Sequence, residues 1–217
     1  MNNVHLICAI VNMTVANRKI KEKEQLKMLI LNSARKLFLE KGIEQTTIRS
    51  IAQHIDYSVG TVYVYFKDKN AILNELHIQG FAQLSQKFSV LRHVENPLER
   101  LIAMGRLYIE FAMDNPDMYE LMFTLKAPMD VLKSSDNEEW DEGINAFTFL
   151  KTTVQQCLEQ HYFEGHQLEP LTFMIWGVVH GMSSLHISER IAGVRLNDAV
   201  QMVPAGFEEF VKLIRKS

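Results

Sequence analysis

The chain has 217 residues, enough for one larger domain or two modest ones. Hydrophobic residues make up 47% and charged residues 23%, a composition that excludes wholesale disorder. Residues 1–80 hold 11 Lys and Arg against 7 Asp and Glu, whereas residues 81–217 hold 12 against 19. This split suits a first domain that binds nucleic acid and a second that stays off it, although chance variation of solvated faces gives the same pattern.

Several classes of protein are disfavoured. Cys8 and Cys157 are too few for a disulfide framework or a cysteine zinc site, and they fit a reducing cytoplasm. No apolar run reaches the length of a membrane span. The motifs of serine hydrolases, P-loop proteins, dinucleotide enzymes and zinc peptidases are absent. We therefore expect no catalytic residues, metal, cofactor or membrane partner.

The first 41 residues contain an expected arm and an expected helix. Residues 1–17 are mildly apolar and lack the basic start of a signal peptide, so we expect a disordered arm, or a translation start at Met13. A charged stretch, Arg18 to Lys27, leads into a helix that ends near Lys41. Gly42 then suits a helix stop, because glycine readily adopts a positive φ.

Two short helices joined by a tight turn are predicted between Thr46 and Lys69. Apolar residues recur at helical spacing from Ile48 to Ile55, and Thr46 or Thr47 can cap this first helix. The triplet Asp56-Tyr57-Ser58 interrupts the pattern. Ser58 then offers a new N-cap for a second helix, Val59 to Phe66. This arrangement is typical of a helix-turn-helix, whose second helix can enter the major groove of DNA.

The segment TTIRSIAQHI…S-x-GTVYVYF-K-x-K, with the preceding ILNSARKLFLEKGIEQTT, resembles the DNA-binding domain of TetR-type transcriptional regulators. The resemblance spans roughly Leu26 to Leu76. Asp56 stands where that family often has Gly, and Val59 where it often has a polar or basic residue. The resemblance, with the hydroxyls and charges present, predicts contacts to DNA backbone or base edges from Thr47, Arg49, Ser58, Val59, Gly60, Thr61, Tyr63, Tyr65, Lys67 and Lys69.

A long helix capped by Asp68 follows and continues to about Leu91. In TetR-type proteins this helix joins the DNA-binding domain to the regulatory domain. We therefore expect a DNA-binding domain over residues 18–80, with the boundary near Gly80, and an effector-binding and dimerisation domain over residues 81–217.

The second domain is also predicted to be helical. Asn96 and Pro97 begin one helix, and Asn115-Pro116 ends it and begins another. An acidic loop is expected over residues 128–142, then helices over 143–161, over 170–187 and from about Asn197, with a kink at Pro204. The segment WGVVHG, residues 176–181, resembles the Trp-His-Gly motif of one TetR subgroup.

Methionine and aromatic side chains recur through this domain. They suit a plastic apolar pocket, although ordinary core packing is the commoner reason for each one taken singly. His180 could hydrogen-bond a ligand or a neighbouring carbonyl in the core, and the second interpretation is favoured. The expected effector pocket consists of Met104, Tyr108, Phe111, Met122, Phe147, Trp176 and His180.

A dimer is expected because one helix-turn-helix reads few base pairs, whereas two related by a two-fold axis read a palindrome. In TetR-type proteins the last two helices pair with their copies. The expected interface consists of Gly177, Gly181, Leu185, Phe207, Phe210, Val211 and Ile214.

Together these patterns predict an all-α protein with a three-helix helix-turn-helix domain and a larger helical domain for ligand binding and dimerisation. The expected function is that of a homodimeric repressor, released from a palindromic double-stranded operator by a largely apolar small molecule. The alternative is a DNA-binding regulator without such an effector, controlled by a protein partner or by its abundance. An enzyme with an incidental helix-turn-helix would need a polar cluster that the sequence does not contain.

Overall fold

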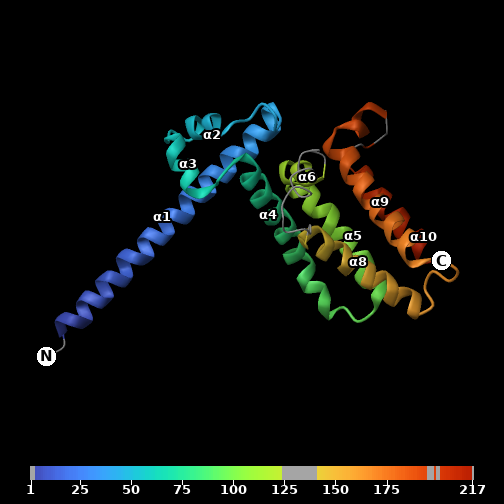
Figure 1. Cartoon of the computed structure of the whole chain (residues 1–217). Coiled ribbons are helices and arrows are strands. Elements are labelled where there is room, and N and C mark those ends of the chain that lie inside the picture. The colour runs from blue at the N-terminus through green and yellow to red at the C-terminus, as the bar shows by residue number, and fades with distance from the viewer. Residues whose placement is uncertain (1–2, 124–140, 195–197, 199–200, 217) are drawn as a thin grey trace. The chain divides into compact units, whose positions relative to one another are not determined.

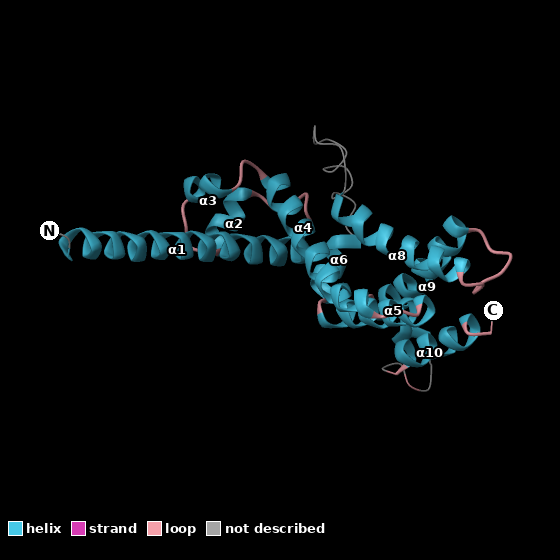
Figure 2. Ribbon diagram, turned by 90° about the horizontal axis from the view of Figure 1, so that it is seen from below, coloured by secondary structure: helices cyan, strands magenta, loops and turns pink. Residues whose placement is uncertain are grey.

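The computed structural model describes residues 3–123, 141–194, 198 and 201–216. Every regular element within these ranges is a helix, which confirms the all-α prediction (Figures 1 and 2). The chain divides into two compact units, residues 1–76 and 77–217, so the division falls four residues before Gly80. It lies within a single helix, α4 (Lys69–Ser89).

The first unit contains α1 (Asn3–Lys41), α2 (Ile48–His54), α3 (Val59–Tyr65) and the beginning of α4. Its core is fully closed to solvent at Phe38 of α1, Ile51 of α2 and Val62 of α3. The helix α1 begins at Asn3, so residues 3–17 differ from the disordered arm expected above. The chain contains neither Gly nor Pro before Gly42, so no residue of that kind interrupts the helix.

Local hydrogen bonds hold the turns of this unit. Thr47 caps α2 in a capping box, in which its hydroxyl accepts from the Ser50 amide and its own amide donates to the Ser50 hydroxyl, both at 3.0 Å. Ser58 caps α3 by accepting from the Thr61 amide at 3.0 Å. Asp56 lies between the two helices with φ +56°, the left-handed conformation that Asp tolerates better than most residues. These bonds account for two helix starts that agree with the sequence prediction.

The second unit contains the rest of α4 and the elements that follow it. These are η1 (Val90–His93), α5 (Pro97–Asp114), α6 (Pro116–Phe123), α8 (Asp141–Glu159), α9 (Leu168–Ile187), η2 (Arg190–Val194) and α10 (Met202–Ile214). The helix α5 is central and packs against both α8 and α9 (Figure 1). Its start is fixed as predicted, because the Asn96 side chain accepts from the Glu99 amide at 3.0 Å and Pro97 occupies the first turn.

Two details of this unit differ from the sequence prediction. The helix α10 begins at Met202, so Pro204 lies in its first turn and needs no kink, because an amide there would have no helical partner. The expected acidic loop over residues 128–142 falls outside the described residues, apart from residues 141 and 142 at the start of α8. Within the described ranges, no helix is both long enough and apolar enough to cross a membrane.

Candidate nucleic-acid interface and ligand cavity

The helix α3 presents one face to the core and the other to solvent. Val62 and, at the end of the helix, Phe66 are buried, and α3 packs against α2. Gly60, Tyr63 and Val64 are exposed, and Val64 has 74% of its surface open. Val64 was not among the predicted contacts, although its position two residues after the buried Val62 indicates the outer face. A short helix with an exposed face and a buried anchor can enter a DNA groove.

The ten predicted DNA contacts all belong to the first unit, and most are accessible. Each of the ten residues is exposed or half-buried: Thr47, Arg49, Ser58, Val59, Gly60, Thr61, Tyr63, Tyr65, Lys67 and Lys69. Arg49 and Lys67 are exposed cations suited to phosphate. The Lys69 ammonium instead donates to the Ile43 carbonyl at 2.6 Å, a bond that fixes the start of α4.

The hydroxyls of Thr47 and Ser58 are occupied by the caps described above, so they position α2 and α3. The Ser58 hydroxyl also lies 2.8 Å from the Thr61 hydroxyl. A cap oxygen keeps spare hydrogen-bonding capacity, so a contact to phosphate remains compatible with capping.

A cavity of about 330 Å³ lies within the second unit. Its walls come from six helices, α4, α5, α6, α8, α9 and α10, and are almost wholly apolar. The lining side chains used below are Phe81, Leu84 and Phe88 of α4, Met104 and Tyr108 of α5, Phe123 of α6, Phe147 of α8, Trp176 of α9, and Phe207, Phe210 and Ile214 of α10. This volume and lining are typical of a site for a small apolar ligand.

Four of the seven predicted pocket residues line this cavity: Met104, Tyr108, Phe147 and Trp176. Phe111 and Met122 are buried core residues that do not reach it, and His180 lies behind its wall. The wall residues of α4 were not predicted. Periodicity identifies an inward face without distinguishing solid core from cavity.

The prediction for α10 needs a correction. Phe207, Val211 and Ile214 were expected at a dimer interface, but the structure buries them inside the same chain, with Phe207 only 3% exposed. They form the inward stripe of α10, and Phe207 and Ile214 reach the cavity. Phe210 also lines the cavity but is half-buried.

A polar cluster lies at one part of the cavity wall. The Tyr108 hydroxyl lies 3.0 Å from His180 Nδ1, and the Tyr119 hydroxyl lies 2.7 Å from the same nitrogen and 3.1 Å from the His180 carbonyl. Burial raises the pKa of Tyr108 to about 12 and also raises the pKa of Tyr119. Burial lowers the pKa of His180 below its usual value. All three groups are therefore uncharged at neutral pH.

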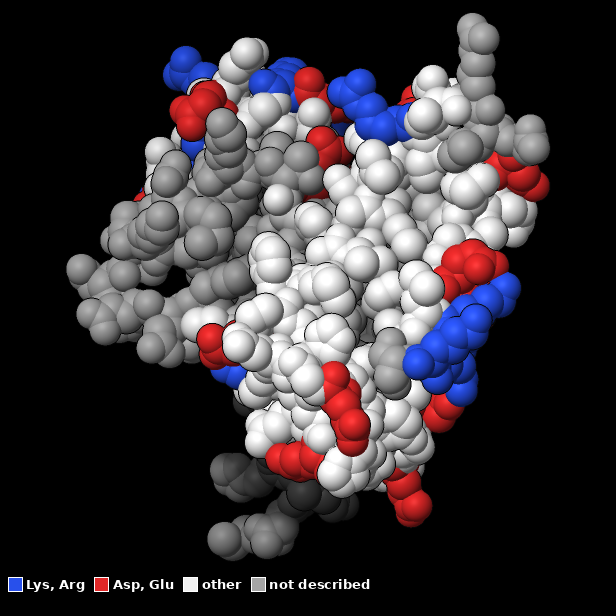
Figure 3. Space-filling model, turned by 90° about the vertical axis from the view of Figure 1, so that its right-hand side faces the viewer, with Lys and Arg blue, Asp and Glu red and all other residues white. Residues whose placement is uncertain are grey.

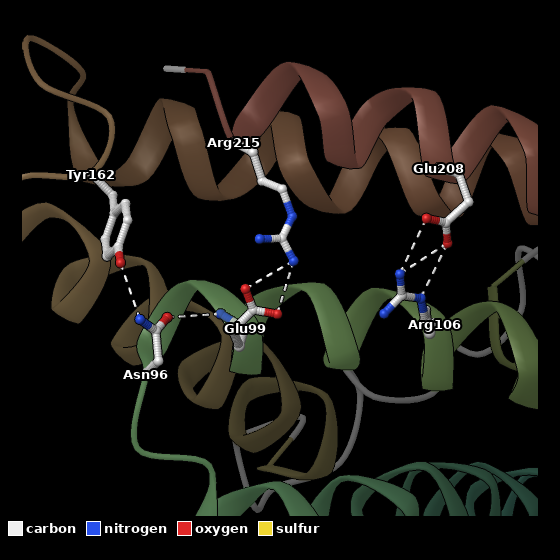
Figure 4. Close-up of polar contacts among 6 residues, drawn as sticks. All are labelled: Asn96, Glu99, Arg106, Tyr162, Glu208 and Arg215. Atoms are coloured by element: carbon white, nitrogen blue, oxygen red, sulfur yellow. Dashed lines mark hydrogen bonds and ion pairs between the residues drawn. The ribbon is translucent and has the colours of Figure 1, made fainter.

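Two exposed ion pairs join α10 to α5, one at the middle of α10 and one just after its last residue (Figure 4). Arg106 meets Glu208 at 3.0 Å, and Arg215 meets Glu99 at 2.8 Å. Each exposed pair contributes about 0–1 kcal/mol, so they orient α10 more than they stabilise it. The apolar side chains Phe207, Phe210 and Ile214 of α10 line the cavity.

The helix α9 turns an apolar face outward. A Cβ atom built at Gly177 or Gly181 would meet no atom within 4 Å, and Phe173 and Leu185 are exposed, the former by 66%. Figure 3, which views the molecule from the side of α9 and α10, shows uncharged side chains over the centre of this face and charged ones toward its rim. Gly177, Gly181 and Leu185 are therefore accessible in the single chain, and their place at a dimer interface stays a prediction.

Two family models match this chain. Residues 30–76 match bacterial regulatory proteins of the tetR family, and residues 101–206 match the tetracyclin repressor-like C-terminal domain. The chain belongs to the TetR family of transcriptional regulators. The fold and family are thus those of DNA-binding regulators.

Individual TetR-type relatives agree with this assignment. The HTH-type transcriptional regulator YuxN of Bacillus subtilis is 43% identical over 54 residues, which is 25% of this chain and 18% of YuxN. The HTH-type regulator YvkB of the same organism is 24% identical over 164 residues, 75% of this chain and 84% of YvkB. The FadR regulator of Bacillus subtilis, solved in complex with stearoyl-CoA, has a TM-score of 0.63 at 18% identity, covering 85% of this chain and 97% of FadR.

The Trp-His-Gly motif lies on α9, at the wall of the cavity. Trp176 lines the cavity, and its ring lies 5.7 Å from that of His180, which bonds the two tyrosines behind the wall. Gly181 follows on the outward side of α9. The described residues hold no cluster of His, Cys, Asp and Glu side chains that could bind a metal. Membership of the Trp-His-Gly subgroup stays a prediction.

Proposed function

We propose that this TetR-family regulator is a homodimeric repressor that binds a palindromic operator and is released by a largely apolar small molecule. The observation that carries the proposal is that the single helix α4 runs from the DNA-binding unit into the second unit. Its first residues belong to the DNA-binding unit, and Phe81, Leu84 and Phe88 further along the same helix line the cavity. A ligand that moves these three side chains acts directly on the helix that continues into the DNA-binding unit.

Binding to DNA is proposed through α3 and the residues beside it. Tyr63 is exposed on α3, Lys67 is exposed two residues after its end, and Arg49 is exposed on α2. An exposed arginine or lysine contributes mainly through phosphate, whereas Gly60 lets backbone approach the groove closely. Two such units in a dimer would read half-sites about 34–36 Å apart, or a multiple of that spacing.

Dimerisation is proposed through the outward face of α9, with Gly177, Gly181 and Leu185 at its centre and Phe210 of α10 beside it. Helices approach closely where glycines face each other, because no side chain separates the backbones. The uncharged centre and charged rim of this face resemble the anatomy of a protein interface. A dimer acting on a chromosomal operator would work in the cytoplasm.

Release is proposed as a two-state equilibrium in which the ligand prefers the conformation that binds DNA poorly. The almost wholly apolar walls favour a ligand with a large apolar body. A long acyl chain is one such body, and the complex of FadR with stearoyl-CoA supports testing acyl compounds first.

The proposal is tested by selecting binding sites for the full chain from random DNA and then measuring affinity across salt concentrations. We expect a palindromic consensus and a steep fall in affinity as salt rises. Lys67→Ala should weaken binding to all sequences and reduce the salt slope by about one. Lys212→Ala is the matched control, because it removes the same charge from exposed α10 in the second unit. Equal binding to all sequences, or no effect of Lys67→Ala, would refute the proposal.

A further inference from the structure

We propose that Val64 of α3 reads the operator sequence through an apolar contact with the 5-methyl group of a thymine in the major groove. The inference rests on the proposed function, because it concerns the DNA that α3 would enter. It goes further by assigning one base of each half-site to one side chain, and by predicting that this base is selected without a hydrogen bond.

Val64 lies on the line of α3 that faces away from the core of the first unit. Val62 is fully buried, and successive residues of an α-helix turn by about 100°, so Val64 lies about 200° around the helix from the buried side. Gly60 lies one turn earlier on the same outer line and is also exposed. A helix that enters a groove with its buried side behind it therefore presents Gly60 and Val64 to the base edges.

This outer line carries no side chain that can form a hydrogen bond. Gly60 has no side chain, and Val64 ends in two methyl groups. The hydroxyl-bearing residues Tyr63 and Tyr65 lie about 100° to either side of Val64, and so occupy the flanks of the helix. Hydroxyls at the flanks suit the phosphates that border the groove, whereas the centre offers only apolar contact to the bases.

Gly60 permits the close approach that a short side chain needs. The methyl groups of valine lie only two bonds beyond Cα, so they touch a base only if the backbone of α3 comes deep into the groove. A Cβ atom built at Gly60 would meet only the Ser58 hydroxyl oxygen, at 3.7 Å, so the space in front of the helix is open. Without a side chain at this position, the backbone can come close to the DNA, and Val64 can reach a base edge.

Thymine is the base whose major-groove edge offers an apolar group. The edges of adenine, guanine and cytosine present donors and acceptors, whereas thymine adds a 5-methyl group beside its O4 acceptor. A donor or acceptor covered by valine loses its hydration and gains no hydrogen bond in exchange. The burial of a thymine methyl group against Val64 instead favours binding about fourfold, and the two half-sites of a palindrome together about fifteenfold.

The test uses the operator selected with the full chain and replaces its thymines one at a time, symmetrically in both half-sites, by deoxyuridine. This replacement removes only the 5-methyl group. For the wild type we expect one position at which it weakens binding about fifteenfold. In Val64→Ala this penalty should fall to about twofold or less, because the coupled methyl groups are gone. Val90→Ala is the matched control and should keep the full penalty, because Val90 is an exposed valine of η1 in the second unit.

The outcomes separate the two proposals. If no palindromic sequence can be selected, both are overturned. If an operator is selected but every deoxyuridine replacement binds as tightly as thymine, the thymine contact is refuted without any variant and the proposed function stands. A penalty that persists in Val64→Ala would assign the methyl group to another residue and refute the role of Val64.

Salt dependence gives a second readout. Val64→Ala should leave the salt slope unchanged, because it removes no phosphate contact, and a reduced slope would contradict a base contact. Val64 is exposed and alanine is favoured in helices, so the variant should fold, which far-UV circular dichroism checks.

Discussion

Replacing the two outward glycines of α9 by alanine should have opposite effects on the single chain and on the dimer. A Cβ atom at Gly177 or Gly181 meets no atom within 4 Å in the single chain. Alanine is favoured over glycine inside a helix by about 1 kcal/mol, so Gly177→Ala and Gly181→Ala should each stabilise the isolated chain by about that amount. The substitutions stabilise the single chain because the space beside both glycines is open there. In the proposed dimer a second copy would fill that space.

In the dimer, the added methyl groups must fit between closely packed helices. Overpacking of this kind costs about 1–3 kcal/mol per site, and two-fold symmetry places each substitution at the interface twice. We therefore expect the free energy of association to weaken by at least about 2 kcal/mol, which raises the dimer Kd roughly thirtyfold.

Sedimentation equilibrium measures the dimer Kd, and thermal unfolding of a dilute sample measures the stability of the chain. Asn32→Ala provides the control, because Asn32 is exposed on α1 in the first unit and its replacement raises helix propensity without touching α9. Stabilised variants with an unchanged dimer Kd would refute a close approach of helices at these glycines.

Three further substitutions test the packing, the electrostatics and the caps. Burial lowers the pKa of His77 to about 4. The unfolded chain therefore takes up a proton on His77 near pH 6.5, whereas the folded chain takes it up only near pH 4. The contribution of neutral His77 to the free energy of unfolding is complete above pH 6.5 and is lost as the pH falls from 6.5 to 4. Between pH 7 and 5 the wild type should lose about 2 kcal/mol from this group and His77→Leu should not, as urea unfolding at the two pH values would measure. A Cβ atom at Gly105 would lie 2.6 Å from two ring atoms of Phe207, so Gly105→Ala should destabilise the chain by about 1–2 kcal/mol despite its better helix propensity; a raised melting temperature would contradict the close contact of α5 with α10. Ser58→Ala removes the cap of α3 and should cost about 1 kcal/mol in urea unfolding, and an unchanged midpoint would show that the cap is dispensable.

Helix starts could be predicted from the sequence because caps are local. Asn96, Ser58 and Thr47 each satisfy an amide three residues ahead, so a few neighbouring residues determine where α5, α3 and α2 begin. The start of α10 was harder to predict, because Pro204 suits a kink and a first turn equally well from sequence alone. Tertiary packing decides between them.

The partners of apolar faces could not be predicted in the same way. The stripe of Phe207, Val211 and Ile214 was identified correctly as apolar, but spacing does not reveal whether such a stripe meets its own chain or a second copy. The polar cluster was likewise hidden, because Tyr108 and His180 are 72 residues apart and meet only when α5 packs against α9.

The central claim is that a ligand in the cavity lowers the affinity for DNA. Its most direct test is the affinity of the full chain for its selected operator, by fluorescence anisotropy, with and without a saturating ligand that displaces N-phenyl-1-naphthylamine, a neutral probe that fluoresces in apolar sites, from the cavity. Coupling between the two sites should weaken operator binding about 5- to 150-fold, and the operator should weaken ligand binding by the same factor. An operator affinity that is the same with the cavity filled and empty would contradict the account and leave a DNA-binding regulator without a small-molecule switch.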